Sequence, residues 1–470
     1  MANTQIIKLF DFKSPRNNIE NGISELWPKY IKRIKTLAYN VGKRKNLEPF
    51  PSFDDYFSLF SHLLIKYQPC IKDLSVQSQF DIGHFFQNFG KSRKLPITLE
   101  RLYLYNASFD KPITFLRLNH LKNLKHFDIM FGGKEVFIIS IIKSFPYLCP
   151  NLQSLSLRWP YSQTAKTISE LSSVKPLQHL SRLKLQSPSM PTHNLKDILR
   201  NFNDSPLKHL ELLFNIRDED QFVPIARLLE RQRDLQTLKL CIDCEKRFNN
   251  LEEIKIVFNL IDALLHLRNL SISIASKTRK GLLFSELYPA FTNIFTKSIP
   301  LESFQLYIEH LSISNQEFLD LFKALEPRAS ILKKLRIDVG DCEPDQTDSR
   351  IITNFVRNLQ NIRSLKLNGL IISSKVFLEE LTQNICSIRC LRSLTLREIS
   401  AKIPKSTSIG HIKRILQKGS LEKFHCKIPA LRNSFDNASL EKIRRINPSL
   451  VEVPDIPDFN DNQNYTIGIW

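Results

Sequence analysis

Apolar residues recur along the chain in a six-residue frame with the pattern apolar-x-x-apolar-x-apolar. Clear copies are LERLYL at Leu99, LQSLSL at Leu152 and LRSLTL at Leu391. The last two apolar residues of each copy are two positions apart, so their side chains lie on one face of a short strand. Each copy therefore predicts one strand.

The frame occurs fourteen times, at intervals of 25 to 37 residues. Its copies begin at Ile34, Ile71, Leu99, Leu124, Leu152, Leu180, Leu207, Leu235, Leu267, Leu301, Leu332, Ile362, Leu391 and Leu421. A period of about 30 residues is typical of repeat proteins. The series predicts one extended repeat architecture and not several globular domains.

Between the frames lie segments with apolar residues at helical spacing, i, i+3, i+4 and i+7. Examples are 220–234, 316–329 and 374–387, and each predicts a helix. A unit of one strand and one helix is too small to bury its own apolar face, so neighbouring units must stack into a continuous core. The expected fold is an α/β solenoid.

With this strand and helix period, the chain resembles leucine-rich-repeat proteins of the long-repeat, ribonuclease-inhibitor-like type. The resemblance implies a horseshoe with a concave parallel β-sheet and convex helices, built from about 14 irregular repeats over residues 31–445. That family usually places Asn or Cys three residues after the frame, and only Asn215 does so here. We therefore expect irregular turns, with residues 1–30 as an N-terminal cap.

Residues 446–470 have a different composition from the repeats. This segment contains no Lys or Arg, four acidic residues and three prolines, and the prolines exclude a regular helix. We expect an acidic C-terminal tail that either caps the last repeat or competes for a basic surface.

The third, fifth and seventh positions of each frame are expected to face the concave side. All fourteen third positions are polar, as this strand assignment requires. Of the 42 concave positions, eleven are Lys or Arg and four are acidic. The predicted partner-binding residues are the basic positions together with inward-facing aromatic and histidine side chains. They are Arg101, Tyr103, Tyr105, Arg158, Arg182, Lys184, Lys239, Tyr307, Lys334, Arg336, Lys366, Arg397, Lys423, His425 and Lys427.

Composition narrows the class of partner. The 470 residues carry a formal net charge of +20, which favours a partner with an acidic surface. Only 12 residues are glycine, and no phosphate-binding loop is present.

No secretory signal or span-length apolar segment is evident, so the expected location is the cytoplasm, with the nucleus not excluded.

No spacing typical of catalysis or metal binding occurs. Cys241 and Cys244 form a C-x-x-C pair, but a zinc ribbon needs a second pair at comparable spacing. No nucleophile, histidine and carboxylate stand at a recognised spacing. We expect no enzyme activity, no cofactor and no metal.

Three functions remain open from the sequence. The first is a non-catalytic, monomeric protein-interaction scaffold that binds a partner on its basic concave face. The second is the substrate-recognition subunit of an F-box-type (SCF) ubiquitin ligase, as in many similar repeat proteins, although residues 1–30 do not resemble an F-box. The third is binding of RNA or another polyanion, which the charge favours and no motif supports.

Overall fold

The structure is a computed structural model of the whole chain. It describes residues 7–9, 36–40, 72–77, 99–107, 121–131, 142, 145–158, 177–187, 192–216, 219–244, 252–276, 284–295, 299–309, 313–400, 402–427 and 445. The chain divides into two units, Met1–Leu267 and Arg268–Trp470. We call them the first and the second unit.

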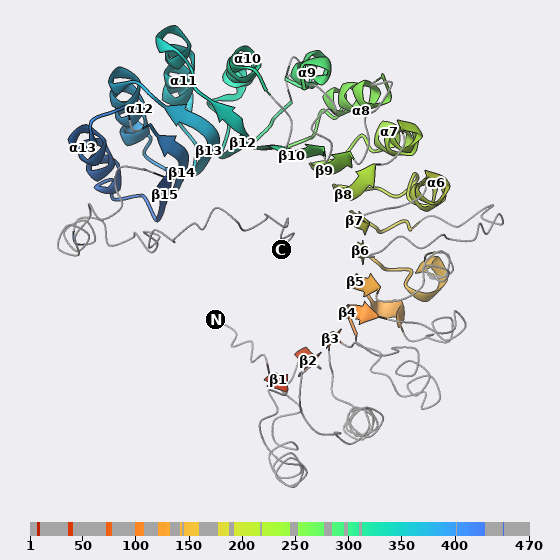
Figure 1. Cartoon of the computed structure of the whole chain (residues 1–470). Helices are drawn as coiled ribbons and strands as arrows, with labels where there is room; N and C mark the ends of the chain where they lie inside the picture. Colours follow the sequence, from red (N-terminus) through yellow and green to blue (C-terminus); the bar gives the residue numbers. More distant parts are fainter. Residues whose placement is uncertain are drawn as a thin grey trace, which may run out of the picture. The chain divides into compact units, whose positions relative to one another are not determined.

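Each unit contains a parallel β-sheet whose strands follow chain order (Figure 1). The described strands of the first unit are β1 Ile7–Leu9, β2 Thr36–Asn40, β3 Asp73–Gln77, β4 Arg101–Ala107, β5 His126–Phe131, β6 Ser154–Arg158, β7 Arg182–Ser187, β8 His209–Ile216 and β9 Thr237–Cys244. Those of the second unit are β10 Asn269–Ser276, β11 Ser303–Glu309, β12 Lys334–Cys342, β13 Ser364–Ile372, β14 Ser393–Ile399 and β15 Lys423–Lys427.

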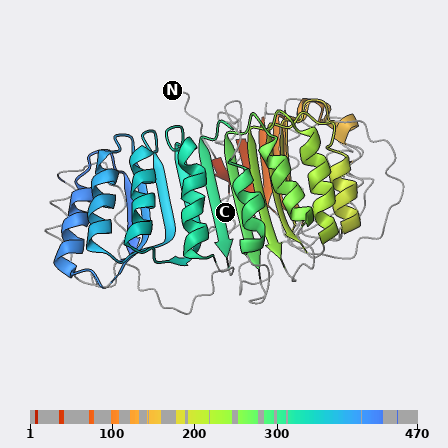
Figure 2. The same ribbon diagram turned by 90° about the horizontal axis from the view of Figure 1, so that it is seen from above.

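Helices alternate with these strands, so the fold is α/β with a repeated strand and helix unit. The described α-helices are α6 Thr192–Arg200, α7 Phe222–Arg231, α8 Glu252–Asp262, α9 Phe284–Asn293, α10 Asn315–Leu325, α11 Gln346–Asn358, α12 Lys375–Ser387 and α13 Lys405–Leu416. Within each unit they lie on one side of the sheet (Figure 2). The helices predicted in 220–234, 316–329 and 374–387 are confirmed as α7, α10 and α12.

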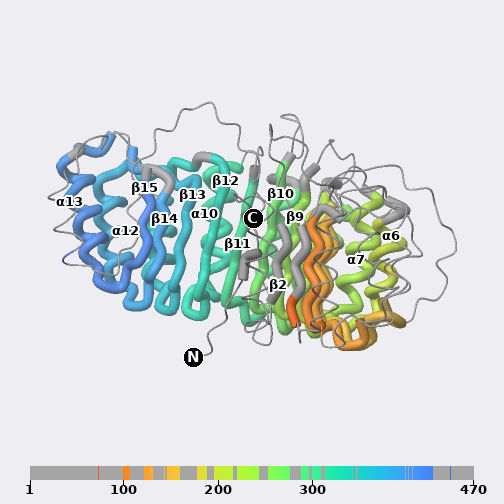
Figure 3. The backbone as a smooth tube through the Cα atoms, turned by 90° about the horizontal axis from the view of Figure 1, so that it is seen from below, coloured from red at the N-terminus to blue at the C-terminus, as the bar shows by residue number. Residues whose placement is uncertain are grey.

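The predicted strand positions are confirmed for all fourteen frames. The third residue of each frame is the first residue of one of the strands β2 to β15. Within a unit, third positions of successive frames are also paired; for example, Lys334 pairs with Ser364 and Ser364 with Ser393. Figure 3 shows β12 to β15 side by side in this order.

The apolar positions of the frame are buried, which explains the regular register. In β13, Leu365 is fully buried and Leu367 is 1% exposed, whereas Ser364, Lys366 and Asn368 between and beside them are half-exposed. The helices cover the apolar face; Phe291 of α9, for instance, packs on Phe304 of β11. A shift by one residue would turn every leucine to water, so burial sets the register.

The other face of each sheet, which we call the open face, carries the third, fifth and seventh positions of the frames. Most of its described side chains from β4 to β15 are half-exposed or exposed, as expected. Ser303 is the most buried of the described third positions, with 9% exposure.

One strand was not predicted. Residues Ile7–Leu9 form β1 and pair with Leu37–Tyr39 of β2. This part of the expected cap thus extends the sheet of the first unit by one strand. The remainder of residues 1–30, and the tail 446–470, lie outside the described residues.

Candidate functional site

The open face of the second unit brings together five side chains from three adjacent strands. Tyr307 lies on β11, Arg336 and Asp338 on β12, and Lys366 and Asn368 on β13. Parallel in-register pairing places Tyr307 beside Asp338, and Asp338 beside Asn368. We call these five residues the Asp338 group.

The carboxylate of Asp338 is the centre of this group. Its Oδ2 atom lies 3.2 Å from Nη2 of Arg336 and 3.5 Å from Nζ of Lys366. The same oxygen accepts a hydrogen bond of 3.1 Å from Nδ2 of Asn368. The guanidinium carbon of Arg336 lies 4.0 Å from the ring centroid of Tyr307, within the range of a cation–π contact.

The Asp338 group has more positive than negative charge. One carboxylate faces two cations, and the side chains of Arg336 and Lys366 are only 30% and 26% exposed. Burial lowers the pKa of Arg336, although Asp338 opposes this shift. Burial also lowers the pKa of Lys366, and the charge of Arg336 lowers it further. Both cations are therefore partly desolvated, and an added anion would stabilise them.

A related arrangement occurs on the open face of the first unit. Arg158 of β6 pairs with Asp128 of β5 through two contacts, Nη2 to Oδ2 at 2.7 Å and Nε to Oδ1 at 3.3 Å. Its guanidinium carbon lies 5.5 Å from the ring centroid of Tyr105 on β4. Burial acts to lower the pKa of Arg158, but the hydrogen bond and charge of Asp128 raise it above its usual value. Among the described residues this carboxylate pairs with one cation, so the two charges balance.

The structure pairs each of the four concave acids counted in the sequence with a predicted binding residue. Besides Asp128 and Asp338, Asp73 lies 3.5 Å from Arg101, and Glu211 lies 3.5 Å from Lys184. Of the nine basic positions whose side chains the structure describes, five are therefore ion-paired with these acids. From the sequence we could count the charged residues of each sign. It could not show which of them form ion pairs, because pairing depends on side-chain conformation.

The remaining predicted residues have three kinds of placement. Lys334, Lys423 and His425 are exposed on the open face of the second unit. On the open face of the first unit Arg182 is exposed, while Lys239 and Tyr103 are half-exposed. Arg397 and Lys427 occupy predicted strand positions in β14 and β15, but their side chains lie outside the described residues.

Two histidines share the open face of the first unit with Arg182: His209 is its neighbour on β8, and His126 lies two strands away on β5. Burial lowers the pKa of His126, and the charges of Arg101 and Arg182 lower it further. Burial, followed by the charges of Arg182 and Lys208, lowers the pKa of His209. The unprotonated form of both histidines is therefore favoured in the folded chain.

Within the described ranges, no three His, Cys, Asp or Glu side chains are grouped closely enough to hold a metal ion. Among the helices that the structure describes, none has the length and apolar content needed to cross a bilayer.

Comparison of the sequence with protein-family models and with curated proteins finds no match. The geometry of the two open faces is therefore the basis for a functional proposal.

Proposed function

We propose that the chain is a non-catalytic protein-interaction scaffold of the leucine-rich-repeat type. In this proposal the sheet is the concave face of a horseshoe, and a partner with an acidic surface binds to the open face of the second unit. Repetition of one strand and one helix over the described chain supports the architecture. The Asp338 group supports the position and the charge of the contact.

The single observation that carries the proposal is that Arg336 and Lys366 share one carboxylate. A partly buried cation is stable only where opposite charges and hydrogen bonds compensate for lost hydration. Asp338 can neutralise only one of the two. A carboxylate from a partner would supply the missing negative charge and would gain a charge-assisted hydrogen bond.

The surroundings of the Asp338 group also favour a protein partner. The ring of Tyr307 is half-exposed, and the guanidinium group of Arg336 lies over one of its faces. Tyr and Arg side chains often contribute most of the binding energy at protein interfaces. Lys334 and Lys423 are exposed nearby on the same sheet, in the same row of third positions. Exposed cations of this kind accelerate association with an acidic surface.

The test is affinity purification with mass spectrometry, using the full chain, the double variant Lys334→Gln/Lys366→Gln and a matched control. The control is Arg350→Gln/Arg357→Gln, which removes the same charge from exposed positions of α11. We expect a protein that the full chain and the control retain at low salt and that the open-face variant loses. Equal recovery with both variants would contradict the proposed site.

The same purification separates the alternative functions. Recovery of RNA that is lost in the open-face variant would favour polyanion binding. Recovery of a cullin adaptor together with a second protein would favour the ubiquitin-ligase subunit. Small-angle scattering tests the horseshoe: the proposal requires the profile of an open arc, and a profile of two compact bodies joined by a linker would contradict it.

A further inference from the structure

A basic groove lies between helices α6 and α7 of the first unit, on the helical side of the sheet. The hollow has a volume of about 570 Å³. It is lined by Lys196, Arg200, Asn203, Pro224, Arg227, Glu230 and Arg231. Four of these residues are cations and one is an acid, and all four cations are exposed.

The four cations form two pairs with the same spacing. Lys196 and Arg200 are four residues apart on α6, and Arg227 and Arg231 are four residues apart on α7. Residues at this spacing lie on one face of a helix, and like charges there destabilise an isolated helix. We call these four residues the basic quartet.

The stability of the helices does not account for this arrangement. Arg200 and Arg231 lie in the last turns, where the helix dipole favours a cation. Lys196 and Arg227 lie one turn earlier, where that effect has largely decayed. Arg231 forms an ion pair of 3.0 Å with Asp204, but both side chains are more than half exposed, so this pair contributes little.

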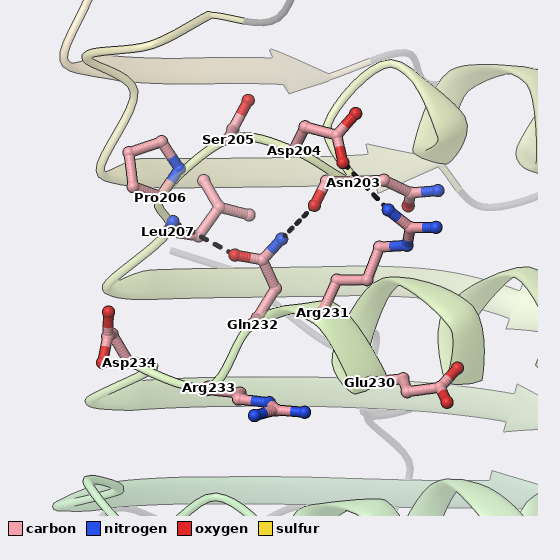
Figure 4. A pocket seen from close by; sticks show the side chains of 10 residues that line it. All are labelled: Asn203, Asp204, Ser205, Pro206, Leu207, Glu230, Arg231, Gln232, Arg233 and Asp234. Atoms are coloured by element: carbon pink, nitrogen blue, oxygen red, sulfur yellow. Dashed lines mark hydrogen bonds and ion pairs between the residues drawn. The ribbon is translucent and has the colours of Figure 1, made fainter.

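A second hollow of about 640 Å³ continues from the groove and shares Asn203, Glu230 and Arg231 with it (Figure 4). Its charged lining residues are two cations, Arg231 and Arg233, and three acids, Asp204, Glu230 and Asp234. The described lining residues thus have a positive net charge in the groove and a negative net charge in the second hollow.

Gln232 fixes the wall of the second hollow. Its Oε1 atom accepts a hydrogen bond from the backbone N–H of Leu207 at 3.1 Å, and its Nε2 atom donates to the backbone carbonyl of Asn203 at 3.0 Å. Figure 4 shows Gln232 between these two contacts. Because Gln232 is 3% exposed, these bonds hold the loop after α6 against the end of α7. The second hollow therefore has a preformed wall.

We propose that this groove binds an acidic peptide segment of a partner protein. Carboxylates of the peptide lie over the basic quartet, and a basic or polar end lies over the acids of the second hollow. A nucleic acid would bring uniform negative charge to those acids, and the described lining residues of the two hollows include no aromatic ring on which a base could stack. This site is separate from the Asp338 group, which belongs to the other unit and to a sheet face.

The test uses the full chain and a fluorescently labelled peptide with a glutamate-rich half followed by a lysine-containing half. A poly-uridine RNA of equal net charge is the second probe. The groove variant is Lys196→Gln/Arg227→Gln, which removes the two cations that the helix dipole does not explain and keeps good helix formers. The matched control is Arg350→Gln/Arg357→Gln on α11, and the open-face variant Lys334→Gln/Lys366→Gln is measured as a comparison.

We expect fluorescence anisotropy to show saturable peptide binding whose dissociation constant rises about fivefold in the groove variant and is unchanged in the α11 control. Hydrogen exchange should show peptide-dependent protection within 192–207 and 222–235. Equal weakening in the groove variant and the α11 control, or no saturable peptide binding, would overturn the proposal. So would RNA binding that is tighter than peptide binding and is lost in the groove variant.

The same measurements distinguish failure of the groove proposal from failure of the function proposed for the open face. If the groove variant loses the peptide and the open-face variant keeps it, the groove proposal stands whatever partner binds the Asp338 group. If only the open-face variant loses the peptide, the acidic segment binds at the Asp338 group and the groove proposal is wrong.

Discussion

The guanidinium group of Arg336 lies 4.0 Å from the ring centroid of Tyr307 on the neighbouring strand and also contacts Asp338. Arg158 makes the same two kinds of contact, with Tyr105 and Asp128, on the first unit. The two arrangements differ in their balance of charge, because among the described residues Asp338 contacts a second cation, Lys366, and Asp128 does not. That difference makes the Asp338 group the better candidate for an anionic partner.

The first prediction concerns the carboxylate of this group. Asp338→Asn leaves Arg336 and Lys366 without a counter-ion, so we expect the free energy of unfolding to fall by roughly 1 kcal/mol. Phosphate ions should stabilise this variant more than the parent chain, since they replace the missing charge. Urea unfolding with and without phosphate measures both effects.

The control for this prediction is Asp345→Asn. Asp345 is exposed and caps α11, with its side chain accepting a hydrogen bond from the backbone N–H of Asp348 at 2.8 Å. Asn caps helices as well as Asp does, so this change alters the net charge equally at little cost. If phosphate stabilises both variants to the same extent, the Asp338 group is not a specific anion site.

The second prediction concerns His126 and His209, which lie on the same open face as Arg182. Its charge contributes to the lowered pKa of both His126 and His209, after burial. Arg182→Gln should therefore raise both pKa values, and NMR titration of the imidazole resonances would measure this. Unchanged pKa values would mean that the charge of Arg182 does not contribute to the shifts.

The sign of the associated pH dependence follows from the same shifts. In the unfolded chain a histidine has a pKa of about 6.5, and in the folded chain these two are lower. As the pH falls toward and below about 6.5, the unfolded state thus binds more protons than the folded state does. The free energy of unfolding therefore decreases toward acidic pH. Arg182→Gln should reduce this acid destabilisation of the first unit.

The third prediction concerns Gly369 in β13, whose backbone φ of +109° is disfavoured for residues with a side chain. A Cβ atom at this position would lie 2.6 Å from the carbonyl oxygen of Val339 and 2.8 Å from that of Gly340, both on β12. We expect Gly369→Ala to lower the free energy of unfolding by at least about 2 kcal/mol.

Gly410 in the interior of α13 is the matched control, because a Cβ atom there meets no atom within 4 Å. Gly410→Ala should raise the free energy of unfolding by about 0.5 to 1 kcal/mol, through the better helix propensity of alanine. Denaturant unfolding of the two variants should therefore give changes of opposite sign. If Gly369→Ala also raised the free energy of unfolding, the contact between β12 and β13 would have to relax.

The fourth prediction rests on the sequence of the tail, which lies outside the described residues. If residues 446–470 cap the last repeat, deletion of 454–470 should lower solubility or the midpoint of thermal unfolding. If the tail competes for a basic surface, the deletion should leave stability unchanged and tighten binding to a polyanion such as heparin. A truncated chain that is unaltered in both respects would exclude both roles.

The sequence alone determined where the strands begin and which side chains they bury. Leu335 and Ile337 stand two residues apart in the frame that starts at Leu332, and both are fully buried in β12. This inference succeeded because the alternation of a strand is a local property that apolar burial enforces. Strand β1 was missed because Ile7–Leu9 is only three residues long and contains no frame.

Only the tertiary structure decided which charges meet. Arg336 and Asp338 are close in sequence, but the sharing of Asp338 with Lys366 requires pairing of β12 with β13 and a particular conformation of each side chain. Likewise, the helical spacing of residues in α6 and in α7 does not indicate that the cations of the two helices line one groove. Hydrophobic periodicity specifies which face is buried, whereas ion pairs and grooves depend on distances between segments about 30 residues apart, and these are set only when the repeats pack.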